Sequence, residues 1–105
     1  MKYKVITLCG STRFKEAFIE TQKRLTLEGN IVISVGFFSQ IDDVWESMNE
    51  TEIADKISML NEMHRQKIDM ADEIFIINVG GYIGESTLSE IEYAKSIGKK
   101  IRYLE

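Results

Sequence analysis

Runs of apolar residues alternate along the chain with segments whose apolar positions recur every three or four residues. The runs predict β-strands at residues 3–8, 31–38, 73–79 and 100–104. The periodic segments predict helices at residues 12–29, 49–70 and 86–97. Gly29 and Gly98 stand where glycine commonly ends a helix. Residues 39–48 have no period, so we expect them to form a loop over the edge of the sheet.

A helix separates each predicted strand from the next. Such alternation favours parallel strands joined by right-handed crossovers. The pattern therefore predicts an α/β fold, a three-layer flavodoxin-like or Rossmann-like sandwich with a four-stranded parallel sheet in the order 2-1-3-4. A length of 105 residues fits a single domain over residues 1–105, and no proline-marked linker divides it.

The longest predicted helix has an apolar stripe made of Ile53, Ile57, Leu60, His64 and Ile68. Ser47 and Glu50 have the spacing of a capping box, which predicts its start. His64 is the only histidine and has two interpretations. It is either a half-buried structural residue, or it faces a cleft, because so long a helix extends beyond a strand of six residues.

Composition excludes several classes of partner and cofactor. The net charge of −4 gives no electrostatic footprint for DNA or RNA. No segment approaches the ~20 apolar residues of a membrane span, and the first apolar run is too short for a signal sequence. One cysteine and one histidine form neither a disulfide nor a structural zinc set. We expect a cytoplasmic protein with no metal, no cofactor and no membrane or nucleic-acid partner.

The first candidate ligand site follows the first strand, at Gly10, Ser11, Thr12 and Arg13. Such a turn offers backbone N–H groups, hydroxyls and a guanidinium to a phosphate. In the alternative interpretation, a hydroxyl only caps the helix and Arg13 is solvated. A cation in the first turn of a helix opposes the helix dipole, which favours ligand contact.

A second polar turn follows the third strand, and its candidate contacts are Gly80, Tyr82, Gly84, Ser86 and Thr87. Its glycines permit close backbone approach to a ligand. Asn78, at the end of the strand, either faces the cleft or binds a loop backbone. Tyr82 and Trp45 either stack on a base or fill the core from loops. Because both turns follow parallel strands, they should open on one sheet edge, where such folds bind nucleotides or phosphorylated sugars.

Glu90 has two interpretations. Thr87 and Glu90 match the capping-box spacing, in which Glu90 would bind the backbone N–H of Thr87. A carboxylate one turn into a helix at the sheet edge is also placed to act as a nucleophile or base at a sugar carbon.

Three stretches resemble the nucleoside 2-deoxyribosyltransferase superfamily. They are the Gly10-Ser11-Thr12-Arg13 turn, the Ala71-Asp72-Glu73 start of an apolar strand, and the stretch EIEYAKSIGK, residues 90–99, which is similar to the family's glutamate-bearing helix. The stretches MHRQKID and NVGGYIGEST look like a small bacterial and phage-associated branch. The resemblance implies that Glu90 attacks the anomeric carbon and that Ser11, Arg13, Ser86 and Thr87 hold a 5′-phosphate or ribose hydroxyls. It puts His64 near the group that assists the leaving base.

We expect a protein that cleaves or transfers at the N-glycosidic bond of a nucleoside or nucleoside 5′-monophosphate. The alternative is a noncatalytic nucleotide-binding or sensing module on the same fold, in which Glu90 is only a cap. A third interpretation is a protein-interaction module that binds no nucleotide. The long amphipathic helix also leads us to expect a homodimer.

Overall fold

Four parallel strands form one sheet in the order β2-β1-β3-β4. The computed structural model describes residues 2–105. Its elements are β1 (Val5–Gly10), α1 (Lys15–Leu27), β2 (Ile31–Ile33), α2 (Glu50–Asp69), β3 (Glu73–Ile77), the short 3₁₀ turn η1 (Val79–Gly81), α3 (Glu85–Ser96) and β4 (Lys100–Tyr103). The predicted parallel α/β fold and strand order are confirmed.

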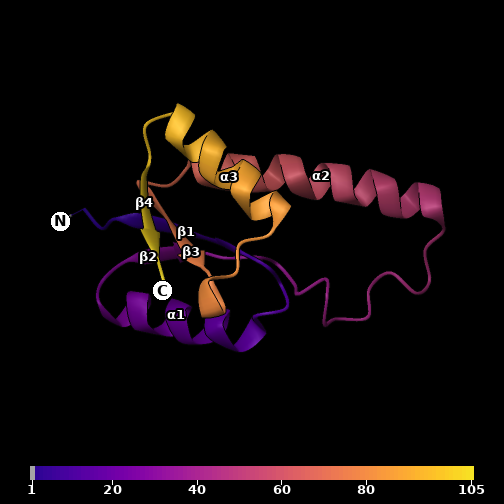
Figure 1. Ribbon diagram of the computed structural model, residues 1–105, viewed down its shortest axis with the longest axis horizontal. Coiled ribbons are helices and arrows are strands. Elements are labelled where there is room, and N and C mark those ends of the chain that lie inside the picture. Colours follow the sequence, from indigo (N-terminus) through magenta and orange to yellow (C-terminus); the bar gives the residue numbers. More distant parts are fainter. Residues whose placement is uncertain (1) are drawn as a thin grey trace.

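Helices cover both faces of the sheet (Figure 1), with α1 on one face and α2 and α3 on the other. Because successive side chains of a strand point to opposite faces, the core falls into two clusters. The cluster under α1 consists of Ile6, Leu8, Phe18, Leu25, Phe75 and Ile77. The cluster under α2 and α3 consists of Cys9, Ile68, Ile74, Ile76, Ile91 and Ala94. Cys9 therefore faces the two helices that carry His64 and Glu90.

The second strand is shorter than predicted, because it ends at Ile33 rather than at residue 38. It pairs with β1 alone, through Ile31, Val32 and Ile33. Beyond it, Val35 and Phe38 still pack against the core cluster under α1, but without a strand partner. The apolar run therefore reflects burial of a loop as well as β-pairing.

The start of α2 also differs from the prediction. Its cap is Asn49, whose side chain accepts from the backbone N–H of Glu52 at 2.9 Å. The Glu52 carboxylate in turn accepts from the Asn49 backbone N–H, which completes a capping box two residues after the predicted one.

The N-terminal half of α2 projects beyond the sheet (Figure 1). Ile57 and Met59 on this half are 45% and 43% exposed, and Met63, in the second half of the helix, is 45% exposed. Within residues 2–105, no helix has the length and apolar character needed to cross a membrane.

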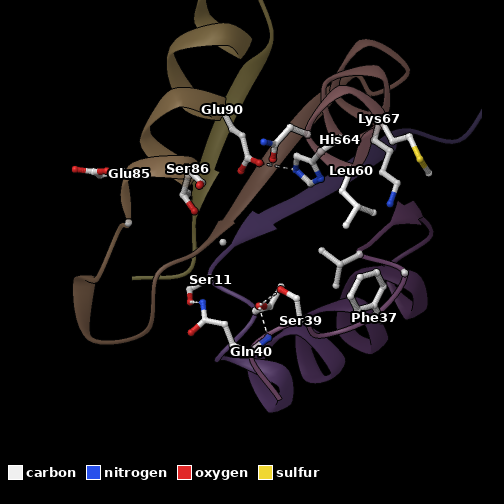
Figure 2. A pocket seen from close by; sticks show the side chains of 18 of the residues that line it. Ser11, Phe37, Ser39, Gln40, Leu60, His64, Lys67, Glu85, Ser86 and Glu90 are labelled. Atoms are coloured by element: carbon white, nitrogen blue, oxygen red, sulfur yellow. Dashed lines mark hydrogen bonds and ion pairs between the residues drawn. The ribbon is translucent and has the colours of Figure 1, made fainter. Parts of the chain in front are cut away.

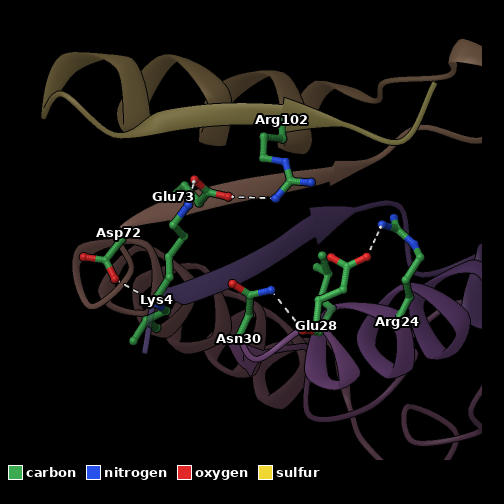
Figure 3. Close-up of polar contacts among 9 residues, drawn as sticks. Lys4, Arg24, Glu28, Asn30, Asp72, Glu73 and Arg102 are labelled. Carbon is green, nitrogen blue, oxygen red and sulfur yellow. Dashed lines mark hydrogen bonds and ion pairs between the residues drawn. The ribbon is translucent and has the colours of Figure 1, made fainter. Parts of the chain in front are cut away.

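The amino edge of the sheet is held by a buried carboxylate (Figure 3). Glu73 is only 2% exposed and binds Arg102 of β4 at 3.0 Å. Its other oxygen lies 3.4 Å from the Lys4 ammonium, just before β1. Asp72 accepts from the Val5 backbone N–H at 2.8 Å. The Ala71-Asp72-Glu73 stretch is thus engaged in joining strands, far from the carboxyl edge where ligands bind in such folds.

Candidate functional site

A cavity of about 500 Å³ opens at the carboxyl edge of β1 and β3 (Figure 2). It is bounded by the turn after β1, the loop after β2, the middle of α2 and the first turns of α3. The predicted site residues that line it are Gly10, Ser11, Thr12, His64, Tyr82, Gly84, Ser86, Thr87 and Glu90. The two polar turns and the predicted catalytic pair thus share one cavity.

Asn78 and Gly80 lie outside this cavity and bind Glu105 instead. The Asn78 side chain donates to the Glu105 carbonyl at 3.1 Å and accepts from the Glu105 backbone N–H at 2.9 Å. The Gly80 backbone N–H donates to the Glu105 carboxylate at 2.9 Å. For Asn78, these contacts match the interpretation as a strand-ending residue that binds the backbone.

Arg13 stands at the rim of the cavity. Its guanidinium carbon lies 4.5 Å from the centroid of the Tyr82 ring, and its Nε donates to the Ser11 hydroxyl at 3.1 Å. Tyr82 is supported on its edge by Phe14, with ring centroids 6.0 Å apart. Arg13 therefore joins the two polar turns across the open side of the cavity.

Gly10 permits a close approach between β1 and β3. Its φ is +150°, and a Cβ there would lie 2.7 Å from the carbonyl oxygen of Ile77, its partner in the ladder. An alanine would meet backbone rather than open space. This glycine thus has a structural function at the cavity floor, whatever the ligand.

Helix α3 begins without a side-chain cap. Its N-cap is Gly84, and the first residues are Glu85, Ser86 and Thr87. The backbone N–H groups of a first turn lack partners within the helix. Because Gly84 is the cap, the capping box predicted for Thr87 and Glu90 is wrong. The Glu90 carboxylate is thereby free to point elsewhere.

The Glu90 carboxylate points toward His64 on α2 (Figure 2). Their nearest atoms, Oε2 of Glu90 and Nε2 of His64, are 3.4 Å apart. The same Nε2 lies 3.3 Å from the Sγ of Cys9, which is fully buried in β1. Three elements of the fold thus bring a thiol, an imidazole and a carboxyl group into contact.

Burial governs the protonation of this cluster. It raises the pKa of Glu90 from 4.5 to about 7, although the positive charge of Arg65 acts in the opposite direction. Burial, assisted by the charge of Lys67, lowers the pKa of His64 from 6.5 to about 4. Burial and then the charge of Glu90 raise the pKa of the Cys9 thiol. At neutral pH the imidazole is therefore uncharged, and its contact with Glu90 is a close polar contact rather than an ion pair.

The loop after β2 closes one wall of the cavity and was not predicted as part of the site. Gln40 donates to the Ser11 hydroxyl at 3.0 Å, and the Ser39 hydroxyl lies 3.2 Å from that of Thr12. Phe37 adds an apolar surface to the lining. The lack of periodicity in residues 39–48 indicated a loop at this edge, but no local pattern marked Ser39 and Gln40.

Of the two aromatic candidates, Tyr82 and Trp45, only Tyr82 lines the cavity. Trp45 packs edge-to-face on Phe37 with ring centroids 6.0 Å apart. Trp45 is therefore behind the cavity wall, where it supports Phe37.

Comparison of the chain with protein-family models, with curated proteins and with solved structures finds no match in any of the three. The class defined by the fold and the site is an α/β sandwich with a carboxyl-bearing cavity at the carboxyl edge of its sheet.

Proposed function

We propose that this protein cleaves or transfers at the N-glycosidic bond of a nucleoside or nucleoside 5′-monophosphate. The observation that carries the proposal is the position of Glu90. Its carboxyl group does not cap the helix, lines the cavity and has a pKa of about 7. The resemblance of the Gly10–Arg13 turn and the Glu90 helix to the nucleoside 2-deoxyribosyltransferase superfamily supports the same assignment.

In this reaction a Glu90 carboxylate oxygen forms a bond to the anomeric carbon of the sugar. The bond from that carbon to the base nitrogen breaks, and the base leaves with the electron pair and takes a proton from solvent. Water, or a second base, then attacks the glycosyl-enzyme and regenerates the carboxylate. Water gives hydrolysis, and a second base gives transfer.

His64 is best suited to position Glu90. With a pKa of about 4, its imidazole is neutral at pH 7 and holds no extra proton for the leaving base. Either tautomer of the imidazole can orient Glu90 across the 3.4 Å contact. An unprotonated Nε2 would accept from the protonated carboxyl group, and Nε2–H would donate to the carboxylate. We therefore assign orientation of the nucleophile to His64, rather than the proton donation expected from the sequence.

The start of α3 is suited to the anionic end of a nucleotide. First-turn N–H groups and the positive end of the helix dipole favour a phosphate near Ser86 and Thr87. Across the cavity Ser11 adds a hydroxyl, and Arg13 at the rim adds a positive charge. Tyr82 and Phe37 offer aromatic surface to a base.

The decisive experiment is chromatographic detection of free base after incubation with nucleosides, their 5′-monophosphates and NAD, with a chelator present throughout. We expect release of base, reduced at least about 100-fold by Glu90→Gln. The matched control is Glu92→Gln, which alters an exposed carboxylate of the same helix and should leave the rate unchanged. Release that is equal in both variants would refute Glu90 as the nucleophile.

The second candidate is a noncatalytic nucleotide-binding or sensing module. It is favoured by the open first turn of α3, which suits phosphate binding without any chemistry. It predicts no release of base, but thermal stabilisation by one member of the same panel. Glu90→Gln should then leave the affinity nearly unchanged.

We also infer a homodimer formed by the projecting half of α2. Ile57 and Met59 on this half are exposed apolar residues, which a dimer interface would cover. A two-fold axis across the helix would place this surface against its own copy, since a two-fold interface uses the same patch on both chains. Leu60, His64 and Lys67 of α2 line the cavity, so the partner chain would lie close to the site.

A further inference from the structure

Cys9, His64 and Glu90 bring three kinds of metal-binding atom together. The Sγ, the Nε2 and a carboxylate oxygen all lie within 4.8 Å of one another. They come from β1, α2 and α3, so the whole fold rather than one loop fixes their positions. Their donor set of sulfur, nitrogen and oxygen is the set that zinc uses in proteins.

The distances agree with a tetrahedral zinc site. Zinc bonds of about 2.3 Å to sulfur and about 2.0–2.2 Å to nitrogen and oxygen place neighbouring ligand atoms roughly 3.3–3.6 Å apart. The contact from Nε2 to Sγ is 3.3 Å, and that from Nε2 to the Glu90 carboxylate is 3.4 Å. The third pair, Sγ and the carboxylate oxygen, also lies within 4.8 Å.

We propose that Cys9, His64 and Glu90 bind one Zn²⁺ ion and leave its fourth position open to the cavity. A thiolate and a carboxylate balance the charge of the ion. The thiol proton, together with the proton of any Glu90 that is still protonated, is released to solvent on binding. His64 and Glu90 line the cavity, which gives the ion a route from solvent. One soft sulfur and a single carboxylate disfavour Mg²⁺ and Ca²⁺, which need several oxygen ligands.

The neighbouring cation does not occupy this position. Lys67, one turn after His64, donates from its ammonium to the Ser34 carbonyl at 2.9 Å. The Lys67 ammonium is therefore engaged by a backbone carbonyl rather than by the three ligand atoms. Zinc there would engage the carboxylate that the proposed glycosidic reaction needs, so the metal-bound form should be inactive. The metal site can be tested separately from that reaction, because metal binding is measured without a nucleoside.

The experiment is titration of the chelator-treated, reduced protein with Co²⁺, followed by displacement with Zn²⁺. We expect one equivalent of Co²⁺ to produce a sulfur-to-cobalt charge-transfer band and the visible bands of a tetrahedral ion, all lost when Zn²⁺ is added. Calorimetry with Zn²⁺ alone should give the same stoichiometry. Mg²⁺ at the same concentration should produce no response.

Variants separate this site from adventitious binding. Cys9→Ser should abolish the charge-transfer band and weaken Zn²⁺ binding at least about 100-fold, as should His64→Gln. Glu92→Gln is the matched control and should bind as the unaltered protein does. Circular dichroism checks that each variant is folded. Absence of a sulfur band, or Zn²⁺ affinity unchanged in both Cys9→Ser and His64→Gln, would overturn the proposal.

Discussion

The Nε2 atom of His64 lies 3.4 Å from the carboxylate of Glu90, and burial shifts the pKa values of these two groups in opposite directions. The pKa of the acid rises to about 7 and that of the base falls to about 4. Both groups are thus driven toward their neutral forms. A carboxyl group with a raised pKa and an imidazole with a lowered pKa in one cavity are typical of functional sites.

The first prediction concerns stability and pH. The pKa of Glu90 rises from 4.5 to about 7, so its contribution to stability is present below pH 4.5 and is lost as pH rises through 7. The pKa of His64 falls from 6.5 to about 4, so its contribution is present above pH 6.5 and is lost as pH falls through 4. Between these values the two contributions oppose each other.

A variant that lacks either Glu90 or His64 should show the pH dependence of stability that the remaining group contributes. Relative to the unaltered protein, Glu90→Gln should gain stability as pH rises from 4.5 to 7, and His64→Gln should lose it from pH 4 to 6.5. Each pKa shift corresponds to about 3 kcal/mol in the free energy of unfolding. Urea unfolding at a series of pH values, with a chelator present, measures both slopes. Parallel curves for the three proteins would contradict the assignment of these shifts.

The second prediction concerns the rate of the proposed reaction. The nucleophile is the ionised carboxylate, and the pKa of Glu90 is about 7. Release of base should therefore rise with pH and level off above about pH 8, where nearly all of Glu90 is ionised. Initial rates across pH 5 to 9 give the profile. A rate that is constant over this range would indicate that ionisation of Glu90 does not limit the reaction.

The third prediction concerns the floor of the cavity. Gly10→Ala should destabilise the protein by about 2 kcal/mol or more, because its Cβ would lie 2.7 Å from the Ile77 carbonyl oxygen at a φ of +150°. Gly36→Ala is the matched control, since a Cβ there meets no atom within 4 Å. Urea unfolding compares the two. Equal stability would mean that β1 and β3 can move apart at this point.

The fourth prediction concerns the projecting half of α2. If Ile57 and Met59 form a two-fold interface, light scattering at micromolar concentration should give twice the mass of one chain. The double variant Ile57→Glu/Met59→Glu should give the monomer. Leu27→Glu on α1, at a residue that is 79% exposed, is the control and should stay dimeric. A monomeric mass for the unaltered protein would exclude this interface.

The fold could be predicted because its signals are local. Apolar runs separated by periodic segments specify parallel strands, and right-handed crossovers then limit the topologies that they can form. One error in the predicted elements arose where apolar residues are buried without pairing in the sheet. Val35 and Phe38 are apolar because they pack on the core, although their backbone has left the sheet. Asn49 rather than Ser47 caps α2, since both residue types suit that position and spacing alone does not choose between them.

The site could be predicted only in part. His64 and Glu90 stood out as the lone histidine and as a carboxylate at a helix start, but their contact depends on how α2 and α3 pack together. Cys9 resembled any small buried residue, because nothing near it in the sequence indicates a histidine against its sulfur. Gln40 binds Ser11 through a loop whose path has no sequence pattern.

The Glu73, Lys4 and Arg102 network lies at one edge of the sheet, and the cavity lies at the other. The strands are thus joined by ion pairs at residues that do not line the cavity. Changes in the cavity can alter what is bound or how fast it reacts, while these ion pairs at the opposite edge are left intact. Because the residues that join the strands are not those that line the cavity, substitutions in the cavity can change ligand preference without a second substitution that restores stability.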